Sequence, residues 1–375
     1  MKKIFMFVNV DWFFFSHRLP IAKAAKKNNV DMVVYTDFTK AQKENNKDGF
    51  DLLQSPILRT SKSAFHVIFE FFRVYLVVKY GKPDLIHAVT IKPILLLGLV
   101  ARFRSIPFVA AISGLGPAFK PNNYFTKIRL IIVLRLFRVI FNNNKKARII
   151  CQSKDDRDVL LDQFITSSEN ISLFPGSGVD IEVYSPLKKE ANCERYVLMS
   201  SRILSDKGVK EYCLAANIVR SKLGNELKFK LSGPIDSHSP TFISESELKK
   251  LTLSCGVEYL GDRDDMPELL ASALMFVLPS YYAEGMPKVL LEASSCGVPI
   301  ITTDHSGCRD AVIEGETGLL VPTKDADALA NAMINLIENR PLSIKMGNKG
   351  RILAESLYRD SKVVTDHYRL YGELF

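Results

Sequence analysis

The sequence of 375 residues lacks any pair of cysteines in C-x-x-C spacing, which is typical of structural zinc sites and dithiol redox motifs. We also find no export signal, and the thiols of proteins that stay in a reducing compartment remain reduced. The sequence therefore predicts scattered, reduced cysteines, as in cytosolic proteins. The six positions are Cys151, Cys193, Cys213, Cys255, Cys296 and Cys308.

An apolar run long enough to cross a membrane is also missing. A transmembrane helix needs about 20 consecutive apolar residues. Residues 64–80 are interrupted by Glu70 and Arg73, and the apolar part of residues 124–148 is interrupted by Arg129, Arg135 and Arg138. The apolar start with two lysines imitates a secretory leader, but no small-residue cleavage site follows it. We expect residues 3–10 to form a buried first strand of a parallel sheet instead.

The glycine motifs that bind dinucleotides and ATP are incomplete or absent. Gly114 and Gly116 begin a dinucleotide-like string, but Phe119 stands where the third glycine is required, and no Walker A loop is present. The two D-x-D strings, at residues 156–158 and 325–327, lie at expected helix starts, where capping explains them better than metal binding. The sequence therefore indicates neither a nicotinamide cofactor nor a metal.

Positive charge is concentrated in the first half of the chain. Residues 1–175 contain 27 Lys and Arg against 13 Asp and Glu, a net charge of +14. Residues 176–375 contain 23 against 28, a net charge of −5. This asymmetry indicates that the first half faces an anionic partner, either a membrane surface, nucleic acid or a phosphate-bearing lipid. No recognition helix or aromatic RNA-binding motif supports nucleic acid.

Part of that charge lies on a helical pattern at residues 124–148. Arg129, Arg135 and Arg138 stand among Ile, Leu and Phe. The pattern is typical of a basic amphipathic helix in the headgroup layer of a membrane. A helix that packs on the core with a solvated arginine stripe explains the pattern equally well, and only the charge asymmetry favours the membrane.

Short apolar runs alternate with longer helical patterns along the whole chain. The expected strands are residues 3–10, 31–35, 84–89, 107–112, 147–152, 195–200, 227–232, 257–260, 274–278, 299–302 and 319–321. The helical patterns of the first half lie near residues 18–28, 64–80, 93–104, 124–141 and 154–164. The alternation predicts an α/β fold with two doubly wound Rossmann-like domains, which bind ligands at the carboxyl ends of their strands.

The division between the domains is expected where the composition changes. Residues 173–195 are rich in Gly, Pro and Ser and then charged, which predicts a linker. We therefore place an N-terminal domain at residues 1–175 and a C-terminal domain at residues 176–357.

Residues 281–299, YYAEGMPKVLLEASSCGVP, contain two carboxylates separated by seven residues. We expect Pro287 at the first position of a helix that ends just before Gly297, so Glu284 lies in a loop and Glu292 in the helix. Eight helical residues rise about 12 Å, whereas two carboxylates that act on one bond lie about 5 to 9.5 Å apart. The pair therefore looks like two anchors for the ends of one elongated ligand, and not like an acid and a base.

Backbone N–H groups near the helix start lie between these two carboxylates, at Gly285, Met286, Lys288 and Val289. A helix N-terminus of this kind favours an anion. The segment would then present a hydroxyl acceptor, an anion site and a second hydroxyl acceptor in a line. This order matches a ligand made of a sugar, a diphosphate and a ribose. The alternative is one acid that favours the helix dipole and one surface acid, and for an arbitrary E-x7-E it is the better explanation.

A second motif, SSRILSDKGVKEY at residues 200–212, places two cations at a strand-to-helix turn. Arg202 closes the expected strand, Lys207 precedes the helix, and Gly208 allows close approach. Two cations at such a turn suit a diphosphate leaving group. Taken alone, ordinary solvation of a loop is the better explanation.

Two of the six histidines have informative positions. His17 follows the first strand and its loop, which indicates a place facing the cleft between the domains. His87 lies inside an expected strand, so a satisfied core histidine is the better interpretation there.

Taken together, these segments resemble a known family, the retaining nucleotide-sugar glycosyltransferases of family 4 with the GT-B fold. The matching strings are RILSDKGV, YLGDRDDMPELL, LPSYYAEGMPKVLLEASSCGVPIITTDHSGCRD and GETGLLVP, across about residues 195–322, with PGSGVDIEVYSP at the interdomain junction. In the front half, FSHRLPIAKA, DLIHAVTIKP and AISGLGPAF resemble the subgroup that builds O-antigen, capsule and bacterial N-glycan precursors on undecaprenyl diphosphate. The GT-B fold implies two domains that face a cleft, with a last helix at about 358–375 crossing back to the first domain.

The resemblance also implies roles for individual residues. Arg202 and Lys207 would hold the donor diphosphate, Glu284 would bind the sugar hydroxyls, and Glu292 would bind the ribose. The implied donor-binding residues are Arg202, Lys207, Arg263, Glu284, Gly285, Met286, Pro287, Lys288, Val289 and Glu292. The implied catalytic residues are Glu284, Arg202, Lys207 and His17. The implied acceptor side holds His17, Arg18, Gly114 and Gly116.

The front half departs from the family pattern in two places. NVDWFFFSH stands where many relatives carry a Gly-Gly loop after the first strand, and residues 113–114 stand where many carry a histidine. No side chain presents itself as a nucleophile. This fits the front-face mechanism proposed for the family, in which the leaving phosphate helps to deprotonate the acceptor.

The predicted function is retaining transfer of a sugar, expected to be an N-acetylhexosamine, from a UDP-sugar to an undecaprenyl-diphosphate-linked saccharide in surface polysaccharide biosynthesis. The implied partners are the nucleotide sugar, the lipid-linked glycan and an anionic membrane surface met by the basic N-terminal domain, with no nucleic acid. The implied location is cytoplasmic, peripheral on the inner face of the plasma membrane. No resident cofactor and no metal are expected. The alternatives are a GT-B glycosyltransferase with a non-lipid acceptor and a nucleotide-sugar epimerase of the same fold.

Overall fold

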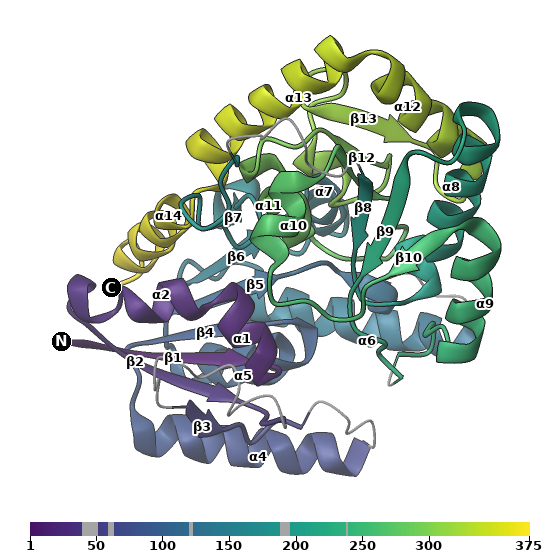
Figure 1. Cartoon of the computed structure of the whole chain (residues 1–375). Coiled ribbons are helices and arrows are strands. Elements are labelled where there is room, and N and C mark those ends of the chain that lie inside the picture. Colours follow the sequence, from purple (N-terminus) through teal and green to yellow (C-terminus); the bar gives the residue numbers. More distant parts are fainter. Residues whose placement is uncertain (40–51, 59–63, 120–122, 188–195, 238) are drawn as a thin grey trace. The chain divides into compact units, whose positions relative to one another are not determined.

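The computed structural model describes residues 1–39, 52–58, 64–119, 123–187, 196–237 and 239–375. The chain divides into two compact units, each built on one parallel sheet (Figure 1). Unit 1 comprises residues 1–177 and 361–375, and unit 2 comprises residues 178–360. The boundaries expected after residues 175 and 357 lie close to these divisions. Cys193 lies outside the described residues.

Unit 1 contains a seven-stranded sheet in the order β3-β2-β1-β4-β5-β6-β7, with every pair parallel. Its strands are β1 (Lys2–Val8), β2 (Val30–Thr36), β3 (Leu52–Gln54), β4 (Leu85–Val89), β5 (Phe108–Ile112), β6 (Ala147–Cys151) and β7 (Ile171–Leu173). The five expected strands are confirmed, with ends shifted by one or two residues. We did not predict β3 and β7, because three residues are too few to show a hydrophobic pattern.

Helices cover both faces of this sheet. They are α1 (Asp11–His17), α2 (Leu19–Lys23), α4 (Ala64–Gly81), α5 (Ile91–Arg104), α6 (Tyr124–Phe141), α7 (Lys154–Asp162) and α14 (Asp360–Gly372). Helices α4, α5 and α6 share one apolar cluster with the sheet, whereas α1, α2 and α14 pack into another. The two-sided covering explains why the central strands β4 and β5 are entirely buried.

The segment expected to be a loop after the first strand is helical. Asp11 stands in the first turn of α1, where a negative charge favours the helix. Phe14 is fully buried in the core of unit 1, so packing stabilises the helix. The expectation of a loop before His17 is therefore wrong, and His17 ends α1.

Unit 2 contains a six-stranded parallel sheet in the order β10-β9-β8-β11-β12-β13. Its strands are β8 (Tyr196–Ser200), β9 (Lys228–Ser232), β10 (Val257–Tyr259), β11 (Met275–Leu278), β12 (Ile300–Thr303) and β13 (Gly318–Val321). Its helices are α8 (Val209–Leu223), α9 (Glu245–Cys255), α10 (Met266–Ser272), α11 (Lys288–Ser295), α12 (Ala326–Glu338) and α13 (Arg340–Leu353). The six expected strands are confirmed.

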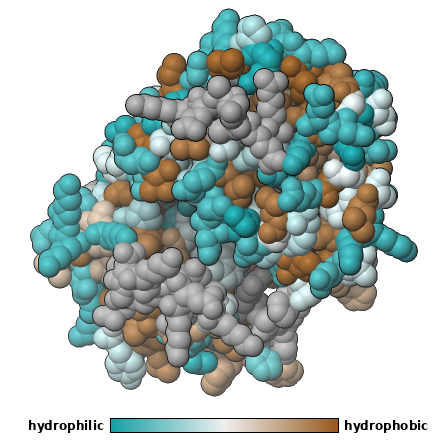
Figure 2. All heavy atoms as spheres, viewed as in Figure 1, coloured by the Kyte–Doolittle hydropathy of each residue, from teal (hydrophilic) through white to brown (hydrophobic). Residues whose placement is uncertain are grey.

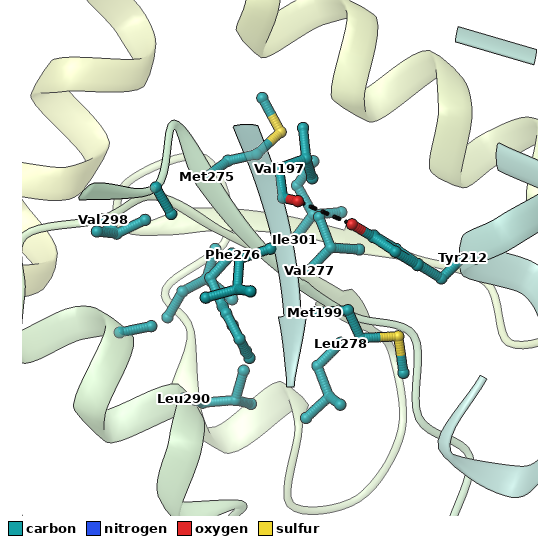
Figure 3. Packing of buried hydrophobic residues seen from close by; sticks show 14 of the residues in the cluster. Val197, Met199, Tyr212, Met275, Phe276, Val277, Leu278, Leu290, Val298 and Ile301 are labelled. Carbon is teal, nitrogen blue, oxygen red and sulfur yellow. Dashed lines mark hydrogen bonds between the residues drawn. The ribbon is translucent and has the colours of Figure 1, made fainter. Parts of the chain in front are cut away.

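The core of unit 2 is one apolar cluster around its central strands (Figure 3). Phe276 of β11 lies beside Leu290 of α11 in this view, and Val197 of β8 and Ile301 of β12 belong to the same cluster. The hydroxyl of Tyr212 donates to the carbonyl of Val197 at 2.9 Å, so the buried phenol is satisfied. The packing holds the ends of β8 and β11 in fixed positions.

Much of the expected linker is part of unit 2. Val179 and Ile181 are buried in its core. Arg351 donates through Nη1 to the carbonyl groups of Ile181 and Tyr184, both at 3.0 Å. Residues 178–187 are therefore not a free linker, and residues 188–195 lie outside the described residues.

The order of both sheets reverses at one point. In unit 1 the reversal falls between β1 and β4, and in unit 2 it falls between β8 and β11. Sheets of this kind bind ligands in the crevice outside the carboxyl ends of the strands at the reversal. Ligands are therefore expected to bind at the loops after these four strands.

Apolar and polar side chains are mixed over the surface of the described residues. Figure 2 shows brown apolar side chains between teal polar ones on the visible face of both units. Within the described ranges, no helix combines the length and apolar character needed to cross a bilayer.

Candidate active site

The reversal point of unit 2 brings two distant loops together. The loop after β8 contains Arg202 and the short 3-10 helix Ser205–Lys207, and the loop after β11 spans residues 279–287. The N–H of Tyr281 donates to the carbonyl of Asp206 at 2.9 Å. The two loops therefore form one surface at the carboxyl ends of β8 and β11.

Glycines allow the loop after β11 to lie close to the loops after β8 and after β12. Gly208 has φ +81°, and a Cβ added there would lie 2.2 Å from the carbonyl oxygen of Pro279. Gly307, also at φ +81°, would place a Cβ 2.2 Å from the carbonyl oxygen of Gly285. Any larger residue would push the loops apart and strain the backbone.

Two cations, each paired with an acid, meet in this surface. Lys207 is only 6% exposed, and its Nζ forms an ion pair with Glu284. Arg202 Nη1 lies 2.8 Å from Asp236 Oδ2. The ring centroid of Tyr282 lies 5.0 Å from Lys207 Nζ and 5.6 Å from Arg202 Cζ, so one aromatic ring contacts both cations.

The surroundings keep Arg202 charged. Burial disfavours the charged guanidinium, but hydrogen bonds with Asp236 and Tyr282 outweigh burial and raise the pKa of Arg202 above its ordinary value. Burial raises the pKa of the neighbouring Asp206 carboxyl. A fixed, partly desolvated positive charge of this kind stabilises negative charge on a bound phosphate or on a leaving oxygen.

The second carboxylate of the motif lies inside α11 and has its own partners. Glu292 is 9% exposed, and Lys288 Nζ lies 3.6 Å from its Oε1, one helical turn away. Burial raises the pKa of Glu292, opposed by the charge of Lys288 and a hydrogen bond with Tyr184. Glu284 and Glu292 are therefore held in separate contacts, Glu284 with Lys207 and Glu292 with Lys288. That Glu284 and Glu292 bind the two ends of one elongated ligand stays a prediction.

The expected helix start was wrong by one residue. Pro287 has φ −63° and ψ 122°, so it is the N-cap, and α11 begins at Lys288. The proline ring fixes φ but leaves ψ free, which allowed an extended conformation. Gly297 has φ +68° just past the helix end, as expected.

The other expected donor-binding residues divide into two groups. Gly285 and Met286 are buried beside Glu284, and Val289 lies half-buried in the first turn of α11. Arg263 follows the edge strand β10 and pairs with Asp265, with Nη2–Oδ2 at 2.6 Å. The structure thus brings Arg263 into contact with Asp265, and not with the Lys207–Glu284 pair.

The candidates on the acceptor side lie in unit 1. The half-buried imidazole of His17 stacks on Phe13 with centroids 4.1 Å apart, and its Nδ1 pairs with the hydroxyl of Ser16. Arg18 is 1% exposed, and burial lowers its pKa to about 10. The guanidinium of Arg18 therefore lies in the interior of unit 1, where it is not exposed for the predicted contact with an acceptor.

The interior around Arg18 contains two further buried bases. His87 is fully buried, as expected for a core histidine, and its Nδ1 lies 2.7 Å from the hydroxyl of Tyr371. His367 Nδ1 donates to the carbonyl of Val363 at 2.7 Å. Burial lowers the pKa of His367 to about 3, and the charge of Arg18 adds to this effect. The cluster ties α14 to unit 1.

The glycines expected on the acceptor side lie in the loop after β5. Gly114 has φ +103° and Gly116 has φ +61°, conformations that favour glycine. Between them, the N–H of Leu115 donates to Asp156 Oδ1 at 3.2 Å. These glycines therefore shape a loop at the carboxyl end of a central strand, which is the expected side for a ligand.

The D-x-D strings have structural roles. Asp325 caps α12 by accepting from the N–H of Ala328 at 2.8 Å. Asp156 stands in the first turn of α7, which Ser153 caps. Across the described part of the chain, no group of three or more His, Cys, Asp or Glu is arranged to hold a metal ion.

Three residues that follow strands were not predicted from the sequence as site residues. Tyr282 lies inside the quoted motif, but nothing in the spacing showed that its ring would contact both cations. Asp236 follows β9, and position after a strand was its only signal. Thr90 follows β4 with φ +73°, a strained conformation for a β-branched residue. Such strain is typical of functional sites, and it falls at the reversal point of unit 1.

Two parallel Rossmann-like units, one with a cationic site at its reversal point, define a doubly wound α/β protein of the class that binds ligands at the carboxyl ends of its strands. Sequence comparison gives the family. Residues 182–352 match the model of "Glycosyl transferases group 1", and residues 3–153 match that of "Glycosyl transferase 4-like". The chain belongs to this glycosyltransferase family, is a glycosyltransferase, and has the GT-B fold.

Curated relatives and solved structures agree with this assignment. The "N,N'-diacetylbacillosaminyl-diphospho-undecaprenol alpha-1,3-N-acetylgalactosaminyltransferase" of Campylobacter jejuni is 27% identical over 371 residues, covering 95% of each chain. The "UDP-Gal:alpha-D-GlcNAc-diphosphoundecaprenol alpha-1,3-galactosyltransferase" of Escherichia coli is 27% identical over 289 residues, covering 73% of this chain and 72% of that one. The Anabaena protein HepE, solved with UDP and glucose, superimposes with a TM-score of 0.80 at 17% identity over 100% of both chains.

Proposed function

We propose that this glycosyltransferase moves a sugar, an N-acetylhexosamine, from a UDP-sugar to an undecaprenyl-diphosphate-linked saccharide with retention of anomeric configuration. The proposed binding of a UDP-sugar donor is supported by the cluster of Arg202, Lys207 and Glu284 around Tyr282, at the carboxyl ends of β8 and β11. It offers two cations to a diphosphate and a carboxylate to hydroxyl groups within one surface.

In this proposal the residues bind and orient the donor. Arg202 and Lys207 neutralise the diphosphate and stabilise the charge that develops on it as the bond to the sugar breaks. Glu284 accepts from sugar hydroxyls, and in the free protein it is held by Lys207. Glu292 accepts from the ribose hydroxyls. Arg263, whose guanidinium pairs with Asp265 in the free protein, lies near the base.

Retention follows from attack on the face that the diphosphate leaves. The acceptor hydroxyl bonds to the anomeric carbon as the bond to the diphosphate oxygen breaks, and the hydroxyl proton passes to that leaving oxygen. The step then needs no protein nucleophile. In unit 1, His17 is the proposed residue near the acceptor hydroxyl, and the loop of Gly114 and Gly116 lines the acceptor side.

The proposed acceptor rests on the curated relatives, and the proposed location rests on the charge of the first half of the chain. Both curated relatives are named for transfer to undecaprenyl-diphosphate-linked sugars. The net charge of +14 on residues 1–175 favours an anionic membrane surface. We therefore also place the protein on the inner face of the plasma membrane, as a peripheral protein working without a metal.

The test is a transfer assay with a panel of UDP-sugars and two acceptors, an undecaprenyl-diphosphate-linked N-acetylhexosamine and the same sugar on a short soluble aglycone. Arg202→Ala and Lys207→Ala should each lower kcat/KM about 10- to 150-fold, since a charge-assisted contact contributes about 1.5 to 3 kcal/mol. Arg263→Ala is the matched control, and its loss should be smaller. The coupling constant of the anomeric proton in the product reports retention, and chelator addition tests the independence from metal.

Other outcomes would redirect the proposal. Equal transfer to the soluble acceptor would favour the non-lipid alternative. Nucleotide released together with an epimerised sugar, in the absence of any acceptor, would favour an epimerase. Near-wild-type turnover in both Arg202→Ala and Lys207→Ala would overturn the donor site.

A further inference from the structure

Helix α4 exposes an apolar stripe that no described residue covers. Six large apolar side chains recur at helical spacing along one side, with exposures from 46% to 85%: Phe65, Ile68, Phe69, Phe72, Leu76 and Tyr80. The opposite side of the helix packs into the core through Val74 and Val78, both fully buried. We call the exposed set the α4 stripe.

Helix α6 repeats this arrangement. Its exposed apolar side chains also follow a helical period, with exposures from 39% to 81%: Tyr124, Phe125, Ile128, Ile131, Ile132 and Val139. Its buried side contains Phe137 and Ile140, in the same core cluster as Val74 and Val78 of α4. We call this set the α6 stripe. A helix that is apolar on both sides has more apolar surface than folding requires.

Both stripes lie on one layer of unit 1 and point away from its sheet. Helices α4 and α6 each pack against α5, which lies between them. Because the two helices bury their other sides in one cluster beneath the layer, their stripes turn outward together. In Figure 1 α4 lies along the lower edge, and Figure 2 shows brown side chains there.

The charges around the stripes have a single sign. Arg73 and Lys79 flank the α4 stripe, and Lys127, Arg129 and Arg135 flank or interrupt the α6 stripe, all five exposed. The α6 sequence contains no Asp or Glu.

The one acid of α4 is turned away from solvent. Glu70 is 3% exposed and accepts from Lys92 Nζ, with Oε2 at 2.8 Å. Within the described residues of the two helices themselves, no acid is exposed, and the charged side chains that they expose are cations.

We infer that the α4 and α6 stripes insert together into the surface of an anionic bilayer, with their cations at the phosphates. Apolar rings enter the acyl boundary, while Lys and Arg stems extend to the headgroups. Cations border both stripes and neither helix exposes an acid, so the charge favours an anionic bilayer as the occupant. The inference rests on the membrane location proposed above and goes beyond electrostatic adsorption of a basic domain, because it requires two separate apolar contacts.

Vesicle co-sedimentation of the full chain tests this inference. The probes are vesicles of equal parts phosphatidylglycerol and phosphatidylcholine, and vesicles of phosphatidylcholine alone. Phe69→Gln/Phe72→Gln and Ile128→Gln/Ile132→Gln should each lower partitioning about tenfold or more, since each removes two inserted side chains. The matched control is Leu253→Gln/Ile352→Gln, which removes two apolar groups of at least equal exposure from unit 2 and should bind as the wild type does.

Salt separates insertion from adsorption. At about 1 M NaCl, where the Debye length falls to about 3 Å, the wild type should retain part of its binding and the stripe variants should lose theirs. Thermal shift with a UDP-sugar confirms that each variant is folded with unit 2 intact. Neither donor nor acceptor enters the vesicle measurement, so its outcome is separate from that of the transfer assay.

Three results would overturn the inference. The first is unchanged partitioning of both stripe variants. The second is loss in the α6 variant alone, which would leave one helix. The third is salt-dependent binding of wild type that disappears completely at high salt. Self-association without vesicles, abolished by the same substitutions, would instead assign the stripes to a second copy of the chain.

Discussion

Replacing Tyr282 by leucine should weaken donor binding, because its ring contacts both cations of the proposed diphosphate site. Lys207 Nζ lies 5.0 Å from the ring centroid with its side chain 7% exposed, and Arg202 Cζ lies 5.6 Å away with its side chain 29% exposed. A cation–π contact contributes about 0.5 to 1 kcal/mol when exposed and about 2 when desolvated. The two contacts together then contribute about 2.5 to 3 kcal/mol to holding the cations in place, and Tyr282→Leu should raise the donor KM by up to about 150-fold.

The neighbouring tyrosine provides the control. The ring of Tyr281 contacts Lys324 at 4.8 Å and neither of the two site cations. Tyr281→Leu should therefore change the donor KM much less, and Tyr282→Phe, which keeps the ring but loses a hydroxyl hydrogen bond with Arg202, should fall between them. The assay is initial-rate release of UDP at saturating acceptor. A donor KM of Tyr282→Leu within twofold of wild type, in a protein of unchanged Tm, would refute the reasoning.

Three further predictions concern stability. Glu292→Gln should raise Tm near neutral pH while weakening donor binding, because burial raises the pKa of Glu292 and its ionised form costs stability; both effects are read by thermal shift with and without UDP-sugar. Gly307→Ala should lower Tm and activity together, because its Cβ would displace the loop that carries Glu284. Lowering the pH below about 6.5 should destabilise unit 1, because His367 is buried neutral with a pKa of about 3, and urea unfolding monitored by Trp12 measures this.

Each stability prediction has an internal check. The Tm gain of Glu292→Gln should vanish as the pH falls through the raised pKa, since protonated glutamate resembles glutamine. Gly315 has φ +72°, but no atom lies within 4 Å of a Cβ added there. The loss in free energy of unfolding should therefore be at least about 1 kcal/mol smaller for Gly315→Ala than for Gly307→Ala. His367→Asn, which cannot take up a proton, should lose part of the pH dependence, and an unchanged dependence would assign it to other groups.

The alternation of strands was predictable because buried parallel strands are short, apolar and separated by helical patterns. The predictions that were wrong concern short segments of the chain. The three-residue strands β3 and β7 had no pattern to read, and Pro287 took an extended ψ that its ring does not control. Residues 178–187 looked like a linker by composition, although Val179 and Ile181 belong to a core.

The candidate site was predictable as a set of residue types at strand ends, and its pairings were not. The sequence indicated Lys207 and Glu284 as ligand groups, but only the folded loops show that they pair with each other. Arg18 stands beside His17 in the chain, yet α14 returns to enclose it with His367 and Tyr371. A contact between residues so far apart in sequence leaves no local pattern.

The return of α14 has a consequence for how the chain is made. Residues 361–375 complete unit 1, and Leu370 and Tyr371 of α14 are buried in the same cluster as β1. During synthesis, therefore, the first unit cannot be finished until all of the second has been produced. Domains ordinarily fold as they emerge, so here the earlier half must wait with part of its core uncovered. A chaperone that shields this half on the ribosome would have more to protect than one that acts on the later half.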